Sequence, residues 1–314
     1  MGGVRGRTGT ELRNGDATLT LTAGGWRALG AFERGTAESL TTRSDAPTID
    51  GEGADRGFSS FASATTLQRL VHFAGVRPGA VVVEVGAGTG QLTFEGGLTP
   101  TAGAAGLILA TDPSVPWLRV LARKRGPSDP VHILCATAES IPVADAQADV
   151  VLGSKFLHYC PDKPAALAEM GRVARAGGSV AVLAATGGEA GSGWLRIFAP
   201  LIAASQSYGT PDAARGFMHA PGDVGRWFRQ VGFVDVETVP LKEPAICIDY
   251  ETTMRWVAQV AGLEALVAGV PEAAERNRLL DAAYGDIKVM FAETQPEERA
   301  FIYHFELVRG RRPG

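Results

Sequence analysis

The stretch VVVEVGAGTGQLT at residues 81–93 decides the fold, because it joins an apolar run to three alternating glycines, Gly86, Gly88 and Gly90. The β-branched run predicts a buried strand. Glycines let the chain turn sharply and approach a ligand closely. A strand that ends in such a turn and opens a helix is typical of a ligand site, because N–H groups at a helix start carry partial positive charge.

Short apolar runs and helical patterns alternate on both sides of this stretch. The apolar runs lie at 81–85, 106–112, 131–136, 148–154 and 179–185, and the helical patterns lie at 63–76, 114–125 and 164–175. Strands that are apolar throughout and alternate with helices imply a parallel sheet covered on both faces. The sequence therefore predicts an α/β fold with a doubly wound, mostly parallel sheet, whose ligand lies beyond the carboxyl ends of the strands.

The distribution of these apolar runs and helical patterns along the sequence predicts four parts. Residues 1–55 form an N-terminal arm that is partly disordered or a lid, and 56–186 form the cofactor-binding core. Residues 187–222 form a cap insertion, and 223–314 complete the sheet with a helical insertion at 242–298. Because loops and insertions carry specificity, we expect the substrate pocket in the last two parts.

Composition excludes several function classes. The chain has 314 residues and a formal net charge of −4, which does not resemble a nucleic-acid binder. No apolar stretch approaches the ~20 residues of a membrane span. The three cysteines, Cys135, Cys160 and Cys247, are widely spaced, which argues against a disulfide framework and a metal site and predicts a cytoplasmic protein.

Two classes of cofactor fit a glycine loop after a strand. The dinucleotide pattern G-x-G-x-x-G would need a third glycine at position 91, which is Gln91. No Lys-Ser/Thr pair follows the loop, so the pattern is not that of a phosphate loop. Glu84 would repel a pyrophosphate but suits a cationic ammonium group. The glycines therefore admit a cofactor, and the acid favours a cationic one.

The spacing E-x-G-x-G-x-G over Glu84–Gly90 resembles the first motif of class I S-adenosylmethionine-dependent methyltransferases. The segment ATAESIPVADAQADVVLGS resembles the family's GDAExLPFxDxxFDVVxS, with Thr137 where the family has Asp. The segment LHYCPDKPAALAEMGRVARAGGSVAVL resembles LHHLPDxxxALxExxRVLKPGGxLxI. The similarity is closest to the small-molecule branch that serves ubiquinone and menaquinone biosynthesis, and it covers about 60–186 well and 222–240 moderately. It implies a seven-stranded, Rossmann-like fold with helical cap insertions.

The resemblance implies a set of S-adenosylmethionine ligands. Glu84 would meet the methionine end of the cofactor, and Asp112, which lies 22 residues after Gly90, would accept the ribose hydroxyls. The expected cofactor-binding residues are Glu84, Gly86, Ala87, Gly88, Gly90, Asp112, Pro113, Thr137, Ala138, Glu139 and Ser154.

The predicted reaction is methyl transfer to a small organic acceptor, on oxygen, carbon or nitrogen, in which alignment of donor and acceptor is the main requirement. His158 and His219 are the candidate general bases, and Lys155 is expected to be solvated. Two alternatives stay open: an NAD-dependent oxidoreductase, and a protein that binds S-adenosylmethionine without methylating.

Aromatic residues in the insertions predict an apolar or aromatic acceptor. The candidates for this pocket are Trp194, Phe198, Tyr208, Phe217, Met218, Tyr250, Trp256 and Met290, with Phe58 and Phe61 closing over the cofactor. The sequence names neither the acceptor nor the atom that is methylated, and it leaves a homodimer open.

Overall fold

The computed structural model describes residues 10–14, 16–22, 63–186, 219–246, 250–251, 267, 270–295 and 300–314. Within these ranges, seven strands form one sheet in the order β5-β4-β3-β6-β7-β9-β8. The strands are β3 (Val81–Val85), β4 (Leu107–Asp112), β5 (Val131–Cys135), β6 (Ala148–Ser154), β7 (Ala174–Thr186), β8 (Val234–Ile246) and β9 (Ala300–Arg311). Strands β3 to β7 are parallel, and β9 is antiparallel to both β7 and β8. The predicted seven-stranded, mostly parallel sheet is confirmed.

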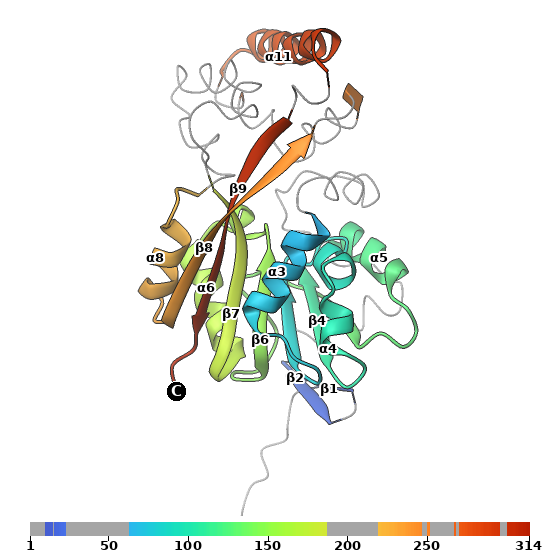
Figure 1. The fold of residues 1–314 in the computed structure, drawn as a ribbon, viewed down its shortest axis with the longest axis vertical. Coiled ribbons are helices and arrows are strands. Elements are labelled where there is room, and N and C mark those ends of the chain that lie inside the picture. Colours follow the sequence, from blue (N-terminus) through green and yellow to red (C-terminus); the bar gives the residue numbers. More distant parts are fainter. Residues whose placement is uncertain are drawn as a thin grey trace, which may run out of the picture.

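Helices cover both faces of the sheet, as the buried strands require (Figure 1). One core cluster contains side chains of α3 (Ala64–Ala74), α4 (Leu98–Ala102) and α5 (Val115–Lys124). The other contains side chains of α6 (Lys163–Val173) and α8 (Asp223–Gln230). Every residue of β3 and β4 is buried, so both faces of these two strands are covered.

Helix boundaries follow from local chemistry at their ends. The side chain of Ser63 accepts a hydrogen bond from the N–H of Thr66 and starts α3, and Gly75 ends it in the left-handed conformation. The side chain of Asp162 accepts from the N–H of Ala165 at the start of α6. These caps fix where each helix begins relative to the strand ends.

The described part of the N-terminal arm is a hairpin of β1 (Thr10–Asn14) and β2 (Ala17–Leu21). Leu19 and Leu21 are fully buried in the core cluster that also contains Leu107 and Val143. The side-chain amide of Asn14 donates to the carbonyl oxygens of Ala104 and Gly106, just before β4. The hairpin therefore lies beneath the amino ends of the strands, away from the edge where a lid would close, and residues 23–55 lie outside the described part.

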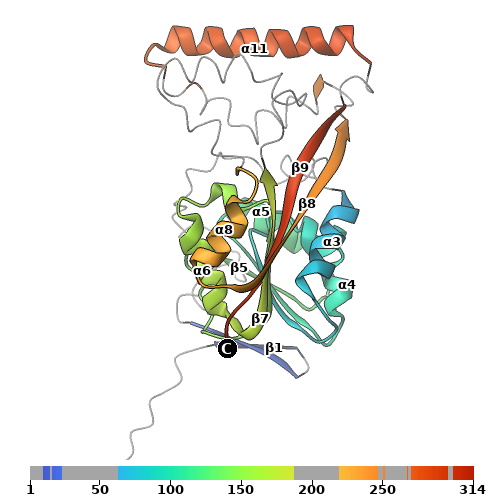
Figure 2. The ribbon, with the colours of Figure 1, turned by 60° about the vertical axis from the view of Figure 1, so that its left-hand side comes forward.

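Strands β8 and β9 continue beyond the rest of the sheet at its carboxyl edge. The pairing of β7 with β9 stops at Thr186↔His304, whereas β8 and β9 stay paired to Ile246↔Ala300. The long helix α11 (Ala273–Glu293) lies above this extension (Figure 2). The strand β8 therefore runs past 242, the predicted start of the helical insertion, to Ile246. Across the described ranges, we find no helix with the length and apolar character needed to cross a bilayer.

Candidate functional site

The glycine loop follows β3 and leads into a π-helical turn, η2 (Gln91–Glu95). Gly86, Gly88 and Gly90 all have positive φ angles, of 69°, 56° and 89°. A Cβ atom built on Gly86 would lie 2.3 Å from Cβ of Phe156, which is closer than any real contact. The bend after β3 therefore requires glycine at position 86, both for its backbone angle and for its space.

Glu84 is a buried acid beside this loop. Its side chain is 1% exposed, and Oε2 accepts a hydrogen bond of 2.6 Å from the hydroxyl of Thr93. Burial raises the pKa of Glu84 to about 8, the Thr93 hydrogen bond acts against this, and the charge of Asp112 adds to it. Among the described residues Glu84 has no ion-pair partner, so the site favours a cation that would take this place.

Asp112 joins the end of β4 to the glycine loop. Its Oδ2 accepts from the N–H of Gly88 at 2.9 Å, and its Oδ1 accepts from the N–H of Ser114 at 2.8 Å. Burial raises the pKa of Asp112 to about 6, and these two backbone hydrogen bonds act against the increase. Each oxygen keeps a second lone pair, so the carboxylate can still accept from a pair of hydroxyl groups.

The segment after β5 contains the next predicted ligands. Thr137 is exposed and forms a bridge with Ser140, whereas Ala138 is buried. Oε1 of Glu139 is buried without a hydrogen-bond partner within the described residues. At the end of β4, the carbonyl oxygen of Pro113 accepts from the thiol of Cys135 at 3.5 Å. The structure thus places the predicted residues of this segment next to the end of β4.

The end of β6 lies directly beside β3. Oγ of Ser154 is buried and has no hydrogen-bond partner in the described part of the chain. The next residue, Lys155, has a φ of 55°, and its N–H donates to the carbonyl oxygen of Leu183 in β7 at 2.8 Å. Burial lowers the pKa of Lys155 to about 8, while Glu243 and Glu95 act to raise it. The prediction that Lys155 is solvated is therefore wrong.

The two predicted bases lie near each other, at the ends of β6 and β7. His158 belongs to a 3₁₀ turn, η3 (Leu157–Tyr159), and His219 forms a bridge with Thr186. Burial lowers the pKa of His158 to about 3, and the charges of His219, Lys155 and Lys163 lower it further. Burial lowers the pKa of His219 to about 4, Lys163 adds to this, and Asp223 acts against it. Both imidazoles are therefore neutral at pH 7.

Sequence reasoning missed three polar groups at this edge, namely Thr93, Lys155 and Glu243. The hydroxyl of Thr93, close after the glycine loop, was a weak indication of a site residue. The position of Lys155 directly after β6 was another. Glu243 gave none, because its place depends on how far β8 extends. Of the predicted pocket residues, Tyr250 packs edge to face against Phe291 at 5.8 Å, and Met290 belongs to α11. The others, from Phe58 to Trp256, lie outside the described residues.

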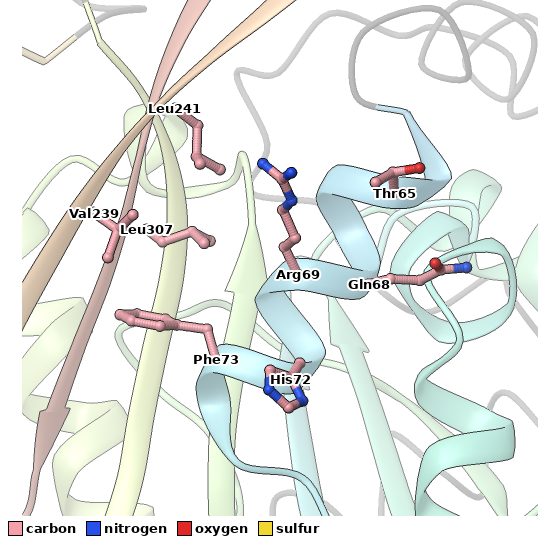
Figure 3. Close-up of a pocket in the computed structure, with 8 residues that line it drawn as sticks. All are labelled: Thr65, Gln68, Arg69, His72, Phe73, Val239, Leu241 and Leu307. Atoms are coloured by element: carbon pink, nitrogen blue, oxygen red, sulfur yellow. The ribbon is translucent and has the colours of Figure 1, made fainter.

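A separate cavity of about 500 Å³ lies between α3 and the β8–β9 pair (Figure 3). Its apolar wall is formed by Phe73, Val239, Leu241 and Leu307, and Arg69 and His72 of α3 border it. None of the predicted cofactor or catalytic residues lines it, so it is distinct from the carboxyl edge.

Comparison with known proteins agrees with this geometry. A family model described as a methyltransferase domain matches residues 83–182. A malonyl-[acyl-carrier protein] O-methyltransferase of Serratia marcescens is 32% identical over 153 residues, which cover 45% of this chain and 56% of that protein. A ubiquinone/menaquinone biosynthesis C-methyltransferase UbiE of Burkholderia mallei is 41% identical over 113 residues, which cover 35% and 45% of the two chains. The chain thus spans about half the length of the curated relatives that it matches.

Solved structures share the fold at low sequence identity. The YcgJ protein of Bacillus subtilis matches with a TM-score of 0.51 and 14% identity, over 79% of this chain and 98% of that chain. A phosphoethanolamine N-methyltransferase 2 of Haemonchus contortus, solved with S-adenosyl-L-methionine, matches with a TM-score of 0.50 and 12% identity, over 84% of this chain and 56% of that chain. This likeness shows the fold that the chain shares with these proteins, and residues 83–182 of that fold match the methyltransferase domain model.

Proposed function

We propose that this protein transfers a methyl group from S-adenosylmethionine to a small organic acceptor. The observation that carries the proposal is the buried carboxyl group of Glu84, which has no ion-pair partner among the described residues and lies beside the glycine loop. A buried acid is stabilised when a cation shares its site. The α-ammonium group of S-adenosylmethionine supplies such a cation.

The remaining residues of the edge fit the other parts of the same cofactor. The lone pairs left on Asp112 accept the two ribose hydroxyls, and the bend at Gly86 keeps side chains out of the space beside them. Thr137, Ala138 and Glu139 border the adenine, with the buried Oε1 of Glu139 as a hydrogen-bond acceptor. Pro113 and Ser154 complete the proposed set.

When bound, S-adenosylmethionine supplies a sulfonium-activated methyl group for in-line displacement. The protein holds the acceptor in line and excludes water, and such positioning lowers a barrier by up to ~7–11 kcal/mol in favourable systems. We assign His158 and His219 to the acceptor side, and the charge effect between them supports placing them together. Because both are neutral at pH 7, each can hydrogen-bond to the acceptor or take its proton. An apolar or aromatic acceptor fits the insertions, and a carbon, oxygen or nitrogen atom can be the nucleophile.

Calorimetry with S-adenosylmethionine, S-adenosylhomocysteine and NAD tests the cofactor. We expect heat with the first two and none with the third, because Gln91 stands where the dinucleotide pattern needs its third glycine. Labelled S-adenosylmethionine with a panel of phenols, quinones and amines then tests transfer. Binding of NAD alone would overturn the proposal.

A non-methylating S-adenosylmethionine-binding protein is the second candidate. It is favoured by the low pKa values of His158 and His219, which make both imidazoles weak bases. Binding without turnover on any acceptor would support it. Cys135 and Cys160 are free thiols, and we place the protein in the reducing cytoplasm as part of the same proposal.

A further inference from the structure

Lys155 occupies the junction between the glycine loop and the end of β6. Its φ of 55° lies in the left-handed region, which residues with a side chain rarely adopt. The backbone is held on both sides of it. The Lys155 N–H donates to Leu183 in β7, and the next side chain, Phe156, packs against Gly86. A strained backbone that the surroundings hold in place is a common feature of functional sites.

The Lys155 side chain lies among charged groups of three elements. Glu95 comes from η2, Glu243 from the extension of β8, and His158 from η3. Both acids also have other partners, because Glu95 pairs with Lys124 at 3.3 Å and Glu243 accepts the N–H of Ser63 at 2.6 Å. The charges of the two acids connect the amine both to the turn after the glycine loop and to β8.

We propose that Lys155 is a catalytic residue that binds the acceptor, and that the acceptor is a phenol or enol whose ionisable hydroxyl faces the amine. The inference rests on the proposed function and names the acceptor class of that same site. Three observations carry it: the position directly after β6, the fixed left-handed backbone, and the contact of the adjoining Phe156 with the glycine loop. Burial also lowers the pKa of the amine to about 8, so a neutral fraction exists near pH 7.

The methyl transfer and the accompanying proton transfer balance with S-adenosylmethionine, the acceptor and Lys155 alone. The neutral amine of Lys155 takes the proton of the acceptor hydroxyl while the oxygen, or the enol carbon, bonds to the methyl carbon. The sulfur–methyl bond breaks, and its electron pair stays on sulfur. The products are the methylated acceptor, the neutral thioether and an ammonium at Lys155, which returns its proton to water.

Carbon-13 NMR of the lysine side chains in the full-length protein tests the inference without a known acceptor. The sequence contains five lysines, so the spectrum is simple, and Lys155→Arg assigns the resonance. S-adenosylmethionine and S-adenosylhomocysteine differ by one methyl group and one positive charge. If Nζ lies beside the transferred methyl group, the pKa of Lys155 should be lower by about one unit or more with S-adenosylmethionine than with S-adenosylhomocysteine.

Two binding outcomes separate this inference from the proposed function. No heat with either compound would overturn the proposed function and this inference with it. If both S-adenosylmethionine and S-adenosylhomocysteine bind but the pKa of Lys155 is the same with each, this inference alone is overturned. Lys242→Met, a matched change at an exposed lysine of β8, should leave both the binding and the titrating resonance unchanged.

Activity gives a second readout. With a phenolic acceptor, Lys155→Met should lower kcat at least about 100-fold while the affinity for S-adenosylmethionine changes less than about threefold. The limb of the pH–rate profile near pH 8 should disappear in Lys155→Met. An unchanged profile in a folded variant would contradict the proposal.

Discussion

The two halves of the carboxyl edge carry opposite chemistry. The ends of β3 and β4 hold two buried acids, Glu84 and Asp112, and burial raises the pKa of both. The ends of β6 and β7 hold three bases, the half-buried Lys155 and His158 and the buried His219, and burial lowers the pKa of all three. Burial thus moves every one of these groups toward its neutral form.

In the proposed function, this contrast separates the donor half from the acceptor half. Neutral acids gain a favourable partner when a cation and hydroxyl donors arrive, and neutral bases gain one when an acidic group arrives. The cofactor fits the first half, and an acceptor with an ionisable proton fits the second. Ligand binding should therefore oppose the pKa shifts that burial causes, and experiments can test this in each half.

Gly86→Ala should break the donor half altogether, because the added Cβ would lie 2.3 Å from Cβ of Phe156. We expect a loss of about 3 kcal/mol or more in unfolding free energy and no measurable binding of S-adenosylmethionine. Urea unfolding and calorimetry measure the two effects. Gly75→Ala is the control, since it is left-handed with a φ of 79° but no atom lies within 4 Å of the new Cβ, and it should cost only about 1 kcal/mol. Equal costs would refute the packing argument.

Glu84→Gln should separate binding from stability. The variant should bind S-adenosylmethionine about 30-fold more weakly, because the ammonium group loses a charged partner. The pKa of Glu84 is about 8 in the fold against an ordinary 4.5, so unfolding free energy should fall as pH rises from 4.5 to 8. The unliganded variant should therefore melt above the wild type at pH 8 and lose this advantage near pH 4.

Calorimetry and thermal melts at the two pH values check both parts. Glu293→Gln, at an exposed position near the end of α11, is the matched control and should change neither. A variant that melts below the wild type at pH 8 would show that Glu84 is not destabilising in the unliganded fold.

His219→Gln should show the opposite pH dependence in the acceptor half. The pKa of His219 is about 4 in the fold against an ordinary 6.5, so wild-type stability is lost as pH falls from 6.5 to 4. The destabilisation caused by the variant should therefore shrink by about 1–2 kcal/mol between pH 8 and pH 5. Denaturant titrations at both pH values measure it. Phe233→Leu removes an aromatic contact with Phe228 that does not include His219 and removes no titrating group, so its cost should be the same at both.

Lys155→Asn should give the smallest change in unfolding free energy. Compared with Lys155→Met, it separates the effect of backbone strain at position 155 from the effect of losing the amine charge. Asn adopts the left-handed region more readily than Lys, so the fold should gain about 0.5–1 kcal/mol relative to Lys155→Met, which keeps the strain. Thermal melts of the two variants measure the difference. Identical melting points would mean that the φ of 55° stores no strain.

The sequence predicted the places of Glu84 and Asp112 well and the burial of Lys155 poorly, for physical reasons. Glu84 and Asp112 end strands whose apolar runs fix their place, so a local pattern carries the information. Lys155 also follows a strand, but its burial depends on Glu243, which lies 88 positions later on a strand extension. Likewise, the packing of Leu19 and Leu21 beneath the sheet depends on partners such as Val143, far along the chain.

The uninterrupted ladder between β8 and β9 has a consequence for protein engineering. Its register runs from Glu237↔Arg309 to Ile246↔Ala300 without a shift. Because β8 and β9 stay paired along this stretch, the segment between Lys242 and His304 can be exchanged as one unit. Chimeras joined at these two positions should keep the proposed cofactor-binding half of the protein unchanged and should differ in acceptor specificity.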